Sequence, residues 1–306
     1  MPPFELTVLG SSSALPATGR NPSAHVLNIH GRFYLIDCGE GTQMQMRRFG
    51  QKIQKIEAIF ISHLHGDHYF GLPGLLGTLH LLGRTQALEI FAPEGLKEII
   101  DIQHKYAETF LRYPLHVHEL NTENASLCYE TEKMTVHTIP LNHRIPCCGF
   151  LFREKPVPGS LNIEAVEKYR ISKEYYIAIK QGNDHRKPDG TIIPNAALVH
   201  PAKPIRSFAY CSDTKADRRI VQHIKGVDLL FHEATFSEEH KDKAEATFHS
   251  TASDAAEIAR EAAVKRLLIG HFSARYENAE RLVQEAKAIF PETGAVEEGS
   301  VYPIIC

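Results

Sequence analysis

The sequence predicts an α/β protein in which sheets pack inside layers of helices. Two observations carry this prediction. Short apolar runs typical of strands alternate along the chain with longer helical patterns, and the alternation occurs in two similar halves. The 306 residues, 43% of them hydrophobic, are sufficient for a sizeable core. We expect one domain over residues 1–306, with residues 153–203 inserted into it as an arm.

The first half of the chain contains five apolar runs of strand length and two longer periodic segments. Runs of this length bounded by turn residues favour strands, whereas a repeat of apolar residues every three to four positions favours a helix. The expected strands are Phe4–Leu9, Val26–Ile29, Phe33–Ile36, Ala58–Ser62 and Glu89–Ala92, and the expected helices are Phe70–Leu82 and Gly95–His104.

The second half repeats this pattern and contains the two helices that the sequence indicates most clearly. Thr251–Ala263 is amphipathic, with Ser250 or Thr251 as its cap and Asp254 in its first turn, and Ala279–Phe290 ends before a proline. The expected strands are His116–Glu119, Met134–Ile139, Gly149–Phe152, Ser207–Cys211, Leu229–His232 and Leu267–Gly270.

Residues 153–203 differ from the remainder in composition. They contain five prolines and the turn tripeptide Pro188-Asp189-Gly190. Their net charge is +3, against −6 for the rest of the chain. A basic segment inserted into an otherwise acidic protein suits a polyanionic partner. The alternative, given equal weight, is that the segment is an ordinary solvated loop.

Composition also excludes several classes of protein. A formal net charge of −3 provides no global positive field of the kind that nucleic-acid binders carry, so any polyanion site is local. The six cysteines are scattered without CxxC pairs, which indicates a reducing compartment and no disulfide framework. No apolar run approaches the roughly 20 residues that span a bilayer. We therefore expect a soluble, cytoplasmic protein without a membrane partner.

A His-x-His-x-Asp-His motif follows the expected strand Ala58–Ser62 and is the sharpest chemical signal. A turn at a strand's C-terminal end directs its side chains toward a common point. Metal–ligand distances near 2.0–2.2 Å prevent one ion from easily taking all four groups, so the motif predicts a two-metal site. Its ligand-type residues are His63, His65, Asp67 and His68.

Three later strands each end in a further ligand-type residue. His143 follows Met134–Ile139, Asp213 follows Ser207–Cys211, and His271 follows Leu267–Gly270. A single such residue is more often a hydrogen-bonding turn residue than a ligand. Repetition of the same arrangement four times makes chance a poor explanation.

This ordered set resembles the metallo-β-lactamase-fold hydrolases, whose αββα sandwich carries a dinuclear metal centre along one edge. The resemblance covers nearly the whole chain. It implies that His63, His65 and His143 hold one ion, that Asp67, His68 and His271 hold the other, and that Asp213 bridges them. Zinc suits imidazole-rich ligation, so we expect two Zn²⁺ per subunit; residue types alone also admit manganese or iron.

Further segments resemble one branch of that superfamily, the short-form ribonuclease Z family. The resemblance implies a homodimeric endonuclease that removes the 3′ trailer from precursor tRNA and grips the tRNA elbow with its arm. The matching segments are the Pro-x-x-x-Arg-Asn loop that ends in Arg20 and Asn21, Asp37–Thr42, His232–Phe236, His249–Thr251 and His271–Tyr276.

The chemistry implied by this resemblance assigns roles to three residues. Water between two cations loses a proton near neutral pH, and the hydroxide attacks the phosphodiester. Asp67 would also orient or deprotonate that water. His249, with an ordinary pKa near 6.5, would protonate the departing 3′-oxygen, and Glu233 would hold its tautomer. The products are a 3′-hydroxyl on the tRNA and a 5′-phosphate on the trailer.

Predicted RNA contacts lie on the loops and on the arm. The arm departs from its family's pattern, because Lys173-Glu174 stands where the family has Gly-Pro, although Lys180 and Gly182 are kept. Phosphate contacts would provide affinity, and recognition would be by shape. The substrate-binding candidates are Arg20, Asn21, Lys173, Lys180 and Arg275.

Several alternatives stay open from the sequence. The same fold and ions serve phosphodiesterases that act on small or other RNA substrates, arylsulfatases and β-lactamases. A catalytically silent RNA-binding module is the non-enzymatic alternative. One pattern is not absorbed by any of these functions: His116 and His118 alternate like a metal pair on an expected strand, yet no neighbouring ligand cluster accompanies them.

Overall fold

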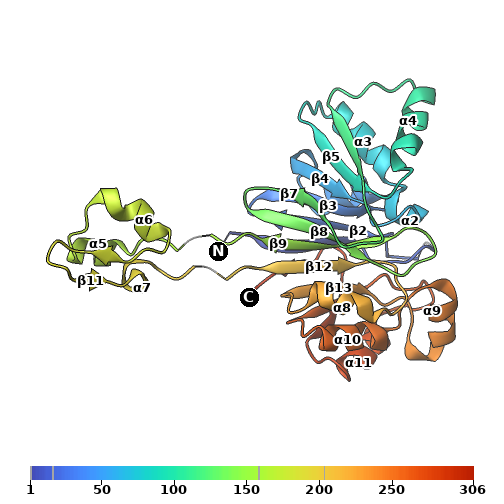
Figure 1. Cartoon of the computed structure of the whole chain (residues 1–306). Coiled ribbons are helices and arrows are strands. Elements are labelled where there is room, and N and C mark those ends of the chain that lie inside the picture. Colours follow the sequence, from blue (N-terminus) through green and yellow to red (C-terminus); the bar gives the residue numbers. More distant parts are fainter. Residues whose placement is uncertain (1, 16, 158, 203) are drawn as a thin grey trace. The chain divides into compact units, whose positions relative to one another are not determined.

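A computed structural model describes residues 2–15, 17–157, 159–202 and 204–306. The chain divides into two compact units, which are described separately below (Figure 1). The larger comprises the chain up to Glu130 together with Thr135–Arg153 and Arg206–Ile305. Pro16, the first residue of the Pro-x-x-x-Arg-Asn motif, and Lys203, the last residue of the expected arm, lie outside the described residues.

The first sheet of the larger unit has seven strands in the order β16-β1-β2-β3-β4-β5-β6. Pairing is antiparallel from β16 to β3 and parallel from β3 to β6, so the C-terminal ends of β3 to β6 lie at one edge. The strands are β1 (Phe4–Gly10), β2 (Ala24–Ile29), β3 (Arg32–Cys38), β4 (Ile56–Phe60), β5 (Leu88–Ala92), β6 (Leu115–Glu119) and β16 (Val301–Pro303).

Three helices cover this sheet: α1 (Thr42–Arg48), α3 (Leu72–Leu81) and α4 (Leu96–Tyr106). Figure 1 shows α3 and α4 beside β4 and β5. They pack through apolar side chains that recur at helical spacing, which form one buried cluster with the outward-facing side chains of the strands. The cluster includes Met46, Leu72, Leu75, Leu76, Leu79, Leu96 and Ile100 from the helices and Val26, Ile59 and Ile90 from the strands.

The second sheet also has seven strands, in the order β15-β14-β13-β12-β9-β8-β7. Strands β12 to β15 are parallel, so they too end at a common edge. Figure 1 shows α8 (Val221–Ile224), α10 (Ala252–Glu261) and α11 (Glu280–Lys287) beside this sheet. Its strands are β7 (Leu127–Glu130), β8 (Met134–Pro140), β9 (Cys148–Glu154), β12 (Ser207–Cys211), β13 (Leu229–Glu233), β14 (Leu267–Gly270) and β15 (Thr293–Ala295).

Aromatic side chains fill the space between the two sheets. Phe60 of β4 contacts Phe150 and Phe152 of β9, with ring centroids 5.4 and 5.3 Å apart. All three side chains are fully buried. Helices outside and two sheets inside make an αββα sandwich, which confirms the predicted fold class.

The predicted helix over Phe70–Leu82 is present as α3 (Leu72–Leu81), which begins two residues later than expected. The single turn α2 (Gly66–Tyr69) before it was not expected. The break falls at Gly71, where a Cβ atom would lie 2.0 Å from the carbonyl oxygen of Gly39, so the chain here passes too close to the backbone for any side chain. Pro73 then occupies the first turn of α3, where its missing N–H costs nothing.

The cap of α10 follows the prediction. Thr251 Oγ1 accepts a hydrogen bond from the backbone N–H of Asp254 at 3.1 Å, and Asp254 Oδ2 accepts one from the backbone N–H of Thr251 at 2.9 Å. This capping box ties down the first turn of α10 and, with it, the residues that precede the helix.

The smaller unit, most of which is Glu154–Ile205, folds around a core of its own. It contains α5 (Ile163–Lys168), α6 (Tyr176–Lys180), α7 (Asn195–Leu198) and a hairpin of β10 (His185–Arg186) and β11 (Ile192–Ile193). The inserted segment is therefore more than a solvated loop. The buried apolar residues of this core are Leu161, Val166, Ile171, Ile179, Ile193 and Leu198.

Candidate metal centre and active site

Four ligand-type side chains come from the segment after β4. The extended backbone at His65, with φ −74° and ψ 144°, leads into the single turn α2, which carries Asp67 and His68. His63 and His68 are fully buried, and the Asp67 side chain is only 6% exposed. The turn therefore brings its polar atoms together inside the protein.

Three more side chains reach the same place from the second sheet. His143 follows β8, Asp213 follows β12 and His271 follows β14. His271 has φ +60°, a left-handed backbone that is uncommon for residues other than glycine and is typical of functional sites. The structure thus brings together all seven ligand-type residues named by the sequence analysis.

Two groups of donor atoms form within this cluster. In the first, His65 Nδ1 lies 3.1 Å from both His63 Nε2 and His143 Nε2, and His63 Nε2 lies 3.6 Å from Asp213 Oδ2. Two ligands of a tetrahedral ion at about 2.0–2.1 Å are themselves about 3.3 Å apart. The first group therefore has the spacing that one bound ion requires.

The second group has the same spacing. His68 Nε2 lies 3.3 Å from Asp67 Oδ2 and 3.3 Å from Asp213 Oδ1. His271 Nε2 lies 3.4 and 3.3 Å from the same two oxygens. Asp213 thus directs one carboxylate oxygen into each group. His68 Nε2 is buried without a hydrogen-bond partner among the described residues, so its lone pair fits a cation.

The outward-facing Nδ1 atoms of three of these histidines have hydrogen-bond partners. His68 Nδ1 donates to Asp37 Oδ2 at 2.8 Å, and His143 Nδ1 donates to the carbonyl oxygen of Phe248 at 3.1 Å. His271 Nδ1 lies 2.9 Å from Thr235 Oγ1. A proton on Nδ1 leaves the Nε2 lone pair free, so these contacts select the tautomer that a metal needs.

Asp37 and Thr235 are residues whose importance the sequence analysis missed. Asp37, at the end of β3, also accepts hydrogen bonds from the backbone N–H of Ser62 at 2.8 Å and the Tyr210 hydroxyl at 2.7 Å. The available signal was its place at the end of a strand, the same pattern that identified Asp213. Nothing in the sequence marked Thr235 apart from its place in the segment His232–Phe236.

The electrostatics of the cluster favour a bound cation. Burial lowers the pKa of His63 well below its ordinary value. Burial also opposes protonation of His68, but the carboxylates of Asp213, Asp67 and Asp37 outweigh it and raise the pKa of His68. Three buried carboxylates around one imidazole create a negative potential that positive charge must balance.

Glu233 and His249 form a hydrogen-bonded pair beside the cluster. Glu233, at the end of β13, is fully buried, and its Oε1 accepts from His249 Nδ1 at 2.9 Å. Its carboxylate also accepts from the backbone N–H groups of Thr214, Thr235 and Ser250. Burial opposes the charge on His249, but Glu233 outweighs it and raises the pKa of His249 to about 9, above the expected value of 6.5. His249 therefore keeps a proton to donate at neutral pH.

The loop residues predicted to contact RNA make internal contacts. Arg20 donates to the backbone carbonyl oxygens of Ser273 and Tyr276, which holds the loop after His271. Asn21 Nδ2 donates to Glu298 Oε2 at 2.8 Å. Both side chains therefore stabilise the loops next to the site.

Arg275 and the two lysines lie on the surface. The exposed guanidinium of Arg275 lies 4.9 Å from the centroid of the Phe236 ring, which in turn contacts the His249 ring. In the smaller unit, Lys173 and Lys180 are exposed, and Lys180 lines a pocket of about 610 Å³ with Tyr176.

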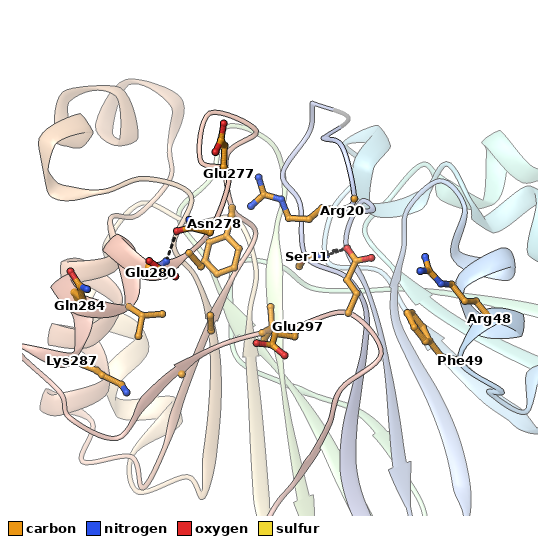
Figure 2. A pocket seen from close by; sticks show the side chains of 18 residues that line it. Ser11, Arg20, Arg48, Phe49, Glu277, Asn278, Glu280, Gln284, Lys287 and Glu297 are labelled. Carbon is orange, nitrogen blue, oxygen red and sulfur yellow. Dashed lines mark hydrogen bonds between the residues drawn. The ribbon is translucent and has the colours of Figure 1, made fainter.

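A separate pocket of about 850 Å³ lies outside the ligand cluster (Figure 2). Figure 2 shows Gln284 and Lys287 at the left, Arg48 with Phe49 at the right, and Arg20 above and between them. Acidic and basic side chains both line it, including Glu280 and Lys287 of α11. None of the seven ligand-type residues lines this pocket, so it is distinct from the metal-type cluster.

The fold and the His/Asp cluster define a metallo-β-lactamase-fold hydrolase. Residues 4–158 match the family described as anti-Pycsar protein Apyc1, and residues 180–272 match that described as beta-lactamase superfamily domain. The solved short form of human tRNase Z is 30% identical, with a TM-score of 0.73, and the match covers 99% of this chain and 100% of that one. A metallo-β-lactamase-fold protein from Bacillus subtilis, YhfI, shares the fold at 18% identity and a TM-score of 0.69, over 99% of this chain and 100% of that one.

Full-length relatives narrow the class. Ribonuclease Z of Bacteroides fragilis strain YCH46 is 48% identical over 293 residues, which are 96% of each chain. Ribonuclease Z of Porphyromonas gingivalis strain W83 is 46% identical, over 97% of this chain and 98% of its own. The chain belongs to the ribonuclease Z family and is a metal-dependent endoribonuclease. Among the described residues, no helix combines the length and the apolar content that crossing a membrane requires.

Proposed function

We propose that this protein removes the 3′ trailer from precursor tRNA by hydrolysing one phosphodiester bond. The observation that carries the proposal is the pair of donor groups sharing Asp213, with the Glu233–His249 pair beside it. Two donor groups next to a protonated histidine provide what phosphodiester hydrolysis requires. Relatives named ribonuclease Z and the human tRNase Z structure support precursor tRNA as the substrate.

The donor atoms favour two zinc ions. His63, His65 and His143 would hold one, Asp67, His68 and His271 the other, and Asp213 would bridge them. Five imidazoles and two carboxylates are ligands that zinc prefers. Two such cations supply an activated water and neutralise charge that develops on the phosphate.

The protein's own side chains position the reacting groups and move the proton. Asp67, whose Oδ2 lies between His68 and His271, orients the attacking water. The Nδ1 proton of His249 is held in the hydrogen bond to Glu233. The Nε2 proton is therefore the one that passes to the departing 3′-oxygen. Glu233 acts through His249 by fixing its ring orientation and stabilising its positive charge. The tRNA then carries a 3′-hydroxyl and the trailer a 5′-phosphate.

The inserted unit is proposed as the second point of contact with tRNA. Lys173 and Lys180 are exposed on a unit with net positive charge, so they are suited to bind tRNA phosphates. Arg275, exposed near His249, is proposed as a phosphate contact close to the cleavage point. This unit and the sandwich would together constitute one functional domain.

We further propose a homodimer in the cytoplasm. Met44 of α1, Phe70 and Leu81 at the end of α3 are 64%, 61% and 82% exposed, which is unusual for large apolar side chains and suits a protein interface. The six cysteines are all free thiols, in keeping with a reducing compartment.

Cleavage of an end-labelled precursor tRNA tests the function. The zinc-loaded protein should cut after the discriminator base and leave a 3′-hydroxyl. His249→Ala and Asp67→Ala should each lower kcat by about 10²-fold or more. His223→Ala, on α8, is the matched control and should retain full activity.

A parallel assay separates tRNA from other phosphodiesters. Lys173→Ala with Lys180→Ala should weaken cleavage of precursor tRNA but leave hydrolysis of bis(p-nitrophenyl) phosphate unchanged, because the small ester needs only the metal centre. If the metal-loaded protein hydrolyses the small ester but leaves precursor tRNA intact, the tRNA assignment is wrong and a small-substrate phosphodiesterase replaces it.

A further inference from the structure

A carboxylate near the C-terminus accepts hydrogen bonds from three separate segments of the chain. Glu298 Oε1 accepts from the backbone N–H of Asn21 at 2.6 Å, and from the backbone N–H and the hydroxyl of Ser11, both at 3.2 Å. Its Oε2 accepts from Asn21 Nδ2 at 2.8 Å and from Gln45 Nε2, on α1, at 2.9 Å. Hydrogen bonds to an ionised acceptor are about twice as strong as neutral ones. These four residues, here called the Glu298 network, therefore tie the three segments together.

The Glu298 network fixes the segment that pairs with the residue after His271. The backbone N–H of Phe272 donates to the carbonyl oxygen of Ser11 at 2.9 Å, and the backbone N–H of Ser13 donates to the carbonyl oxygen of Phe272 at 3.1 Å. Phe272 is only 2% exposed, so its ring is held as well as its backbone. Because Phe272 follows His271 directly, a shift of Ser11 would move the backbone that carries this ligand-type residue.

The same network reaches Asp67 through close packing of the backbone. Pro22, the residue after Asn21, packs against Gly39. A Cβ atom at Gly39 would lie 2.6 Å from Pro22 Cβ and 2.4 Å from the carbonyl oxygen of Asp67. This close contact leaves no free space in which a displacement of Pro22 could be absorbed before it reaches Asp67. Asp67 and His271 both belong to the second group of donor atoms.

The first group of donor atoms is held by different contacts. His143 Nδ1 donates to the carbonyl oxygen of Phe248, and His63 Nδ1 lies 3.0 Å from Ser62 Oγ. Phe248 and Ser62 are not members of the Glu298 network. Loss of this network should therefore affect the second group more than the first.

We propose that Glu298 is a positioning residue for the second group of donor atoms. It fixes His271 and Asp67, and with them the spacing that one cation requires. Glu298 itself is not a member of either group, so it acts through these two ligands. This role rests on the proposed function, which assigns one zinc ion to the second group.

Zinc affinity measured without RNA tests this role. Metal-free protein is titrated with Zn²⁺ in competition with a chromophoric chelator, and His271→Ala identifies the binding step that belongs to the second group. Glu298→Gln keeps the size of the side chain but replaces one acceptor oxygen with an NH₂ group that faces other donors. Residues that support a metal ligand directly contribute about 10–100-fold to affinity, and Glu298 acts one step further out, so we expect a loss of about 10-fold in that step. The other step should stay unchanged.

Two further variants complete the comparison. Asn21→Ala removes one of the five hydrogen bonds to Glu298 and should weaken the same step by a smaller factor. Glu297→Gln is the matched control, because it removes an exposed neighbouring carboxylate outside the Glu298 network, and it should bind zinc like the wild type.

The pattern of affinities separates positioning from a general loss of stability. Equal affinities in the wild type and Glu298→Gln overturn the positioning role, and so does equal weakening of both steps, which a destabilised fold would produce. A wild type with a single zinc-binding step overturns it as well. Because no RNA is present, a protein that leaves precursor tRNA intact refutes the proposed function but keeps the difference in zinc affinity.

Discussion

His25 should make the stability of this protein fall steeply in mild acid. Its side chain lies on β2 between the sheets and is 1% exposed. The ring contacts Tyr210 and Phe231 edge-on, and neither nitrogen has a hydrogen-bond partner among the described residues. Burial, reinforced by the nearby His68 and His271, lowers the pKa of His25 from 6.5 to about 3.

The sign and the size of this pH dependence follow from the protons that His25 binds in the folded and unfolded chains. Between pH 6.5 and 3 the unfolded chain holds a proton on His25 that the folded chain does not, so acid favours unfolding. Each pH unit in this window costs about 1.4 kcal/mol. Integration gives a loss of about 2 kcal/mol on going from pH 7.5 to pH 5, about 4 kcal/mol by pH 3, and a limit of about 5 kcal/mol below that.

Urea unfolding of wild type and His25→Leu at these two pH values measures this contribution. Leucine has a similar volume and no polar atom, so the variant should match or exceed wild-type stability near neutrality. It should lose about 2 kcal/mol less than wild type on acidification. Both proteins release catalytic cations over the same range, so only their difference reports on His25. Equal losses refute the reasoning, and His104→Leu controls for the removal of one histidine.

Three further perturbations test the catalytic centre and its supports. Asp37→Asn should weaken zinc binding about 10–100-fold in a chelator competition, because it removes the charge that orients His68; unchanged affinity contradicts that role. Glu233→Gln and His249→Ala should each lower kcat, and the double variant should lose little more than His249→Ala alone, because the two act as a unit; additive losses would show separate roles. Thr251→Ala should lower the free energy of unfolding by about 1 kcal/mol in urea, because it removes the α10 cap.

Strand ends were the most predictable part of the site. The strands Ser207–Cys211 and Leu267–Gly270 have the predicted bounds, because each is a fully buried apolar run closed by polar residues. His271 follows its strand directly and Asp213 follows after one residue, and parallel pairing through β13 brings both ends to one edge. A ligand at a strand end is therefore readable from local sequence once the strand is recognised.

The partners of the supporting residues could not be predicted because they are distant in the chain. Asp37 meets His68 across the β3–β4 pairing, and Glu89 meets His116 across β5 and β6. The strand-end position of Asp37 marks it as a candidate but does not indicate its partner, and Glu89 alone looks like an ordinary polar residue of a strand. The short edge strands β15 and β16 were also missed, because three residues give no readable period.

The residue types in this fold do not by themselves make a metal centre. The side chains of His68 and Asp213 are 0% and 4% exposed, whereas those of His116 and His118 are 53% and 48% exposed. Burial removes competing water and strengthens the attraction between carboxylates and a cation. Strand-end ligands converge from two sheets on an enclosed point, whereas His116 and His118 alternate along the edge strand β6 and face solvent. The arrangement in the fold, rather than the residue types, therefore determines where a cation is held.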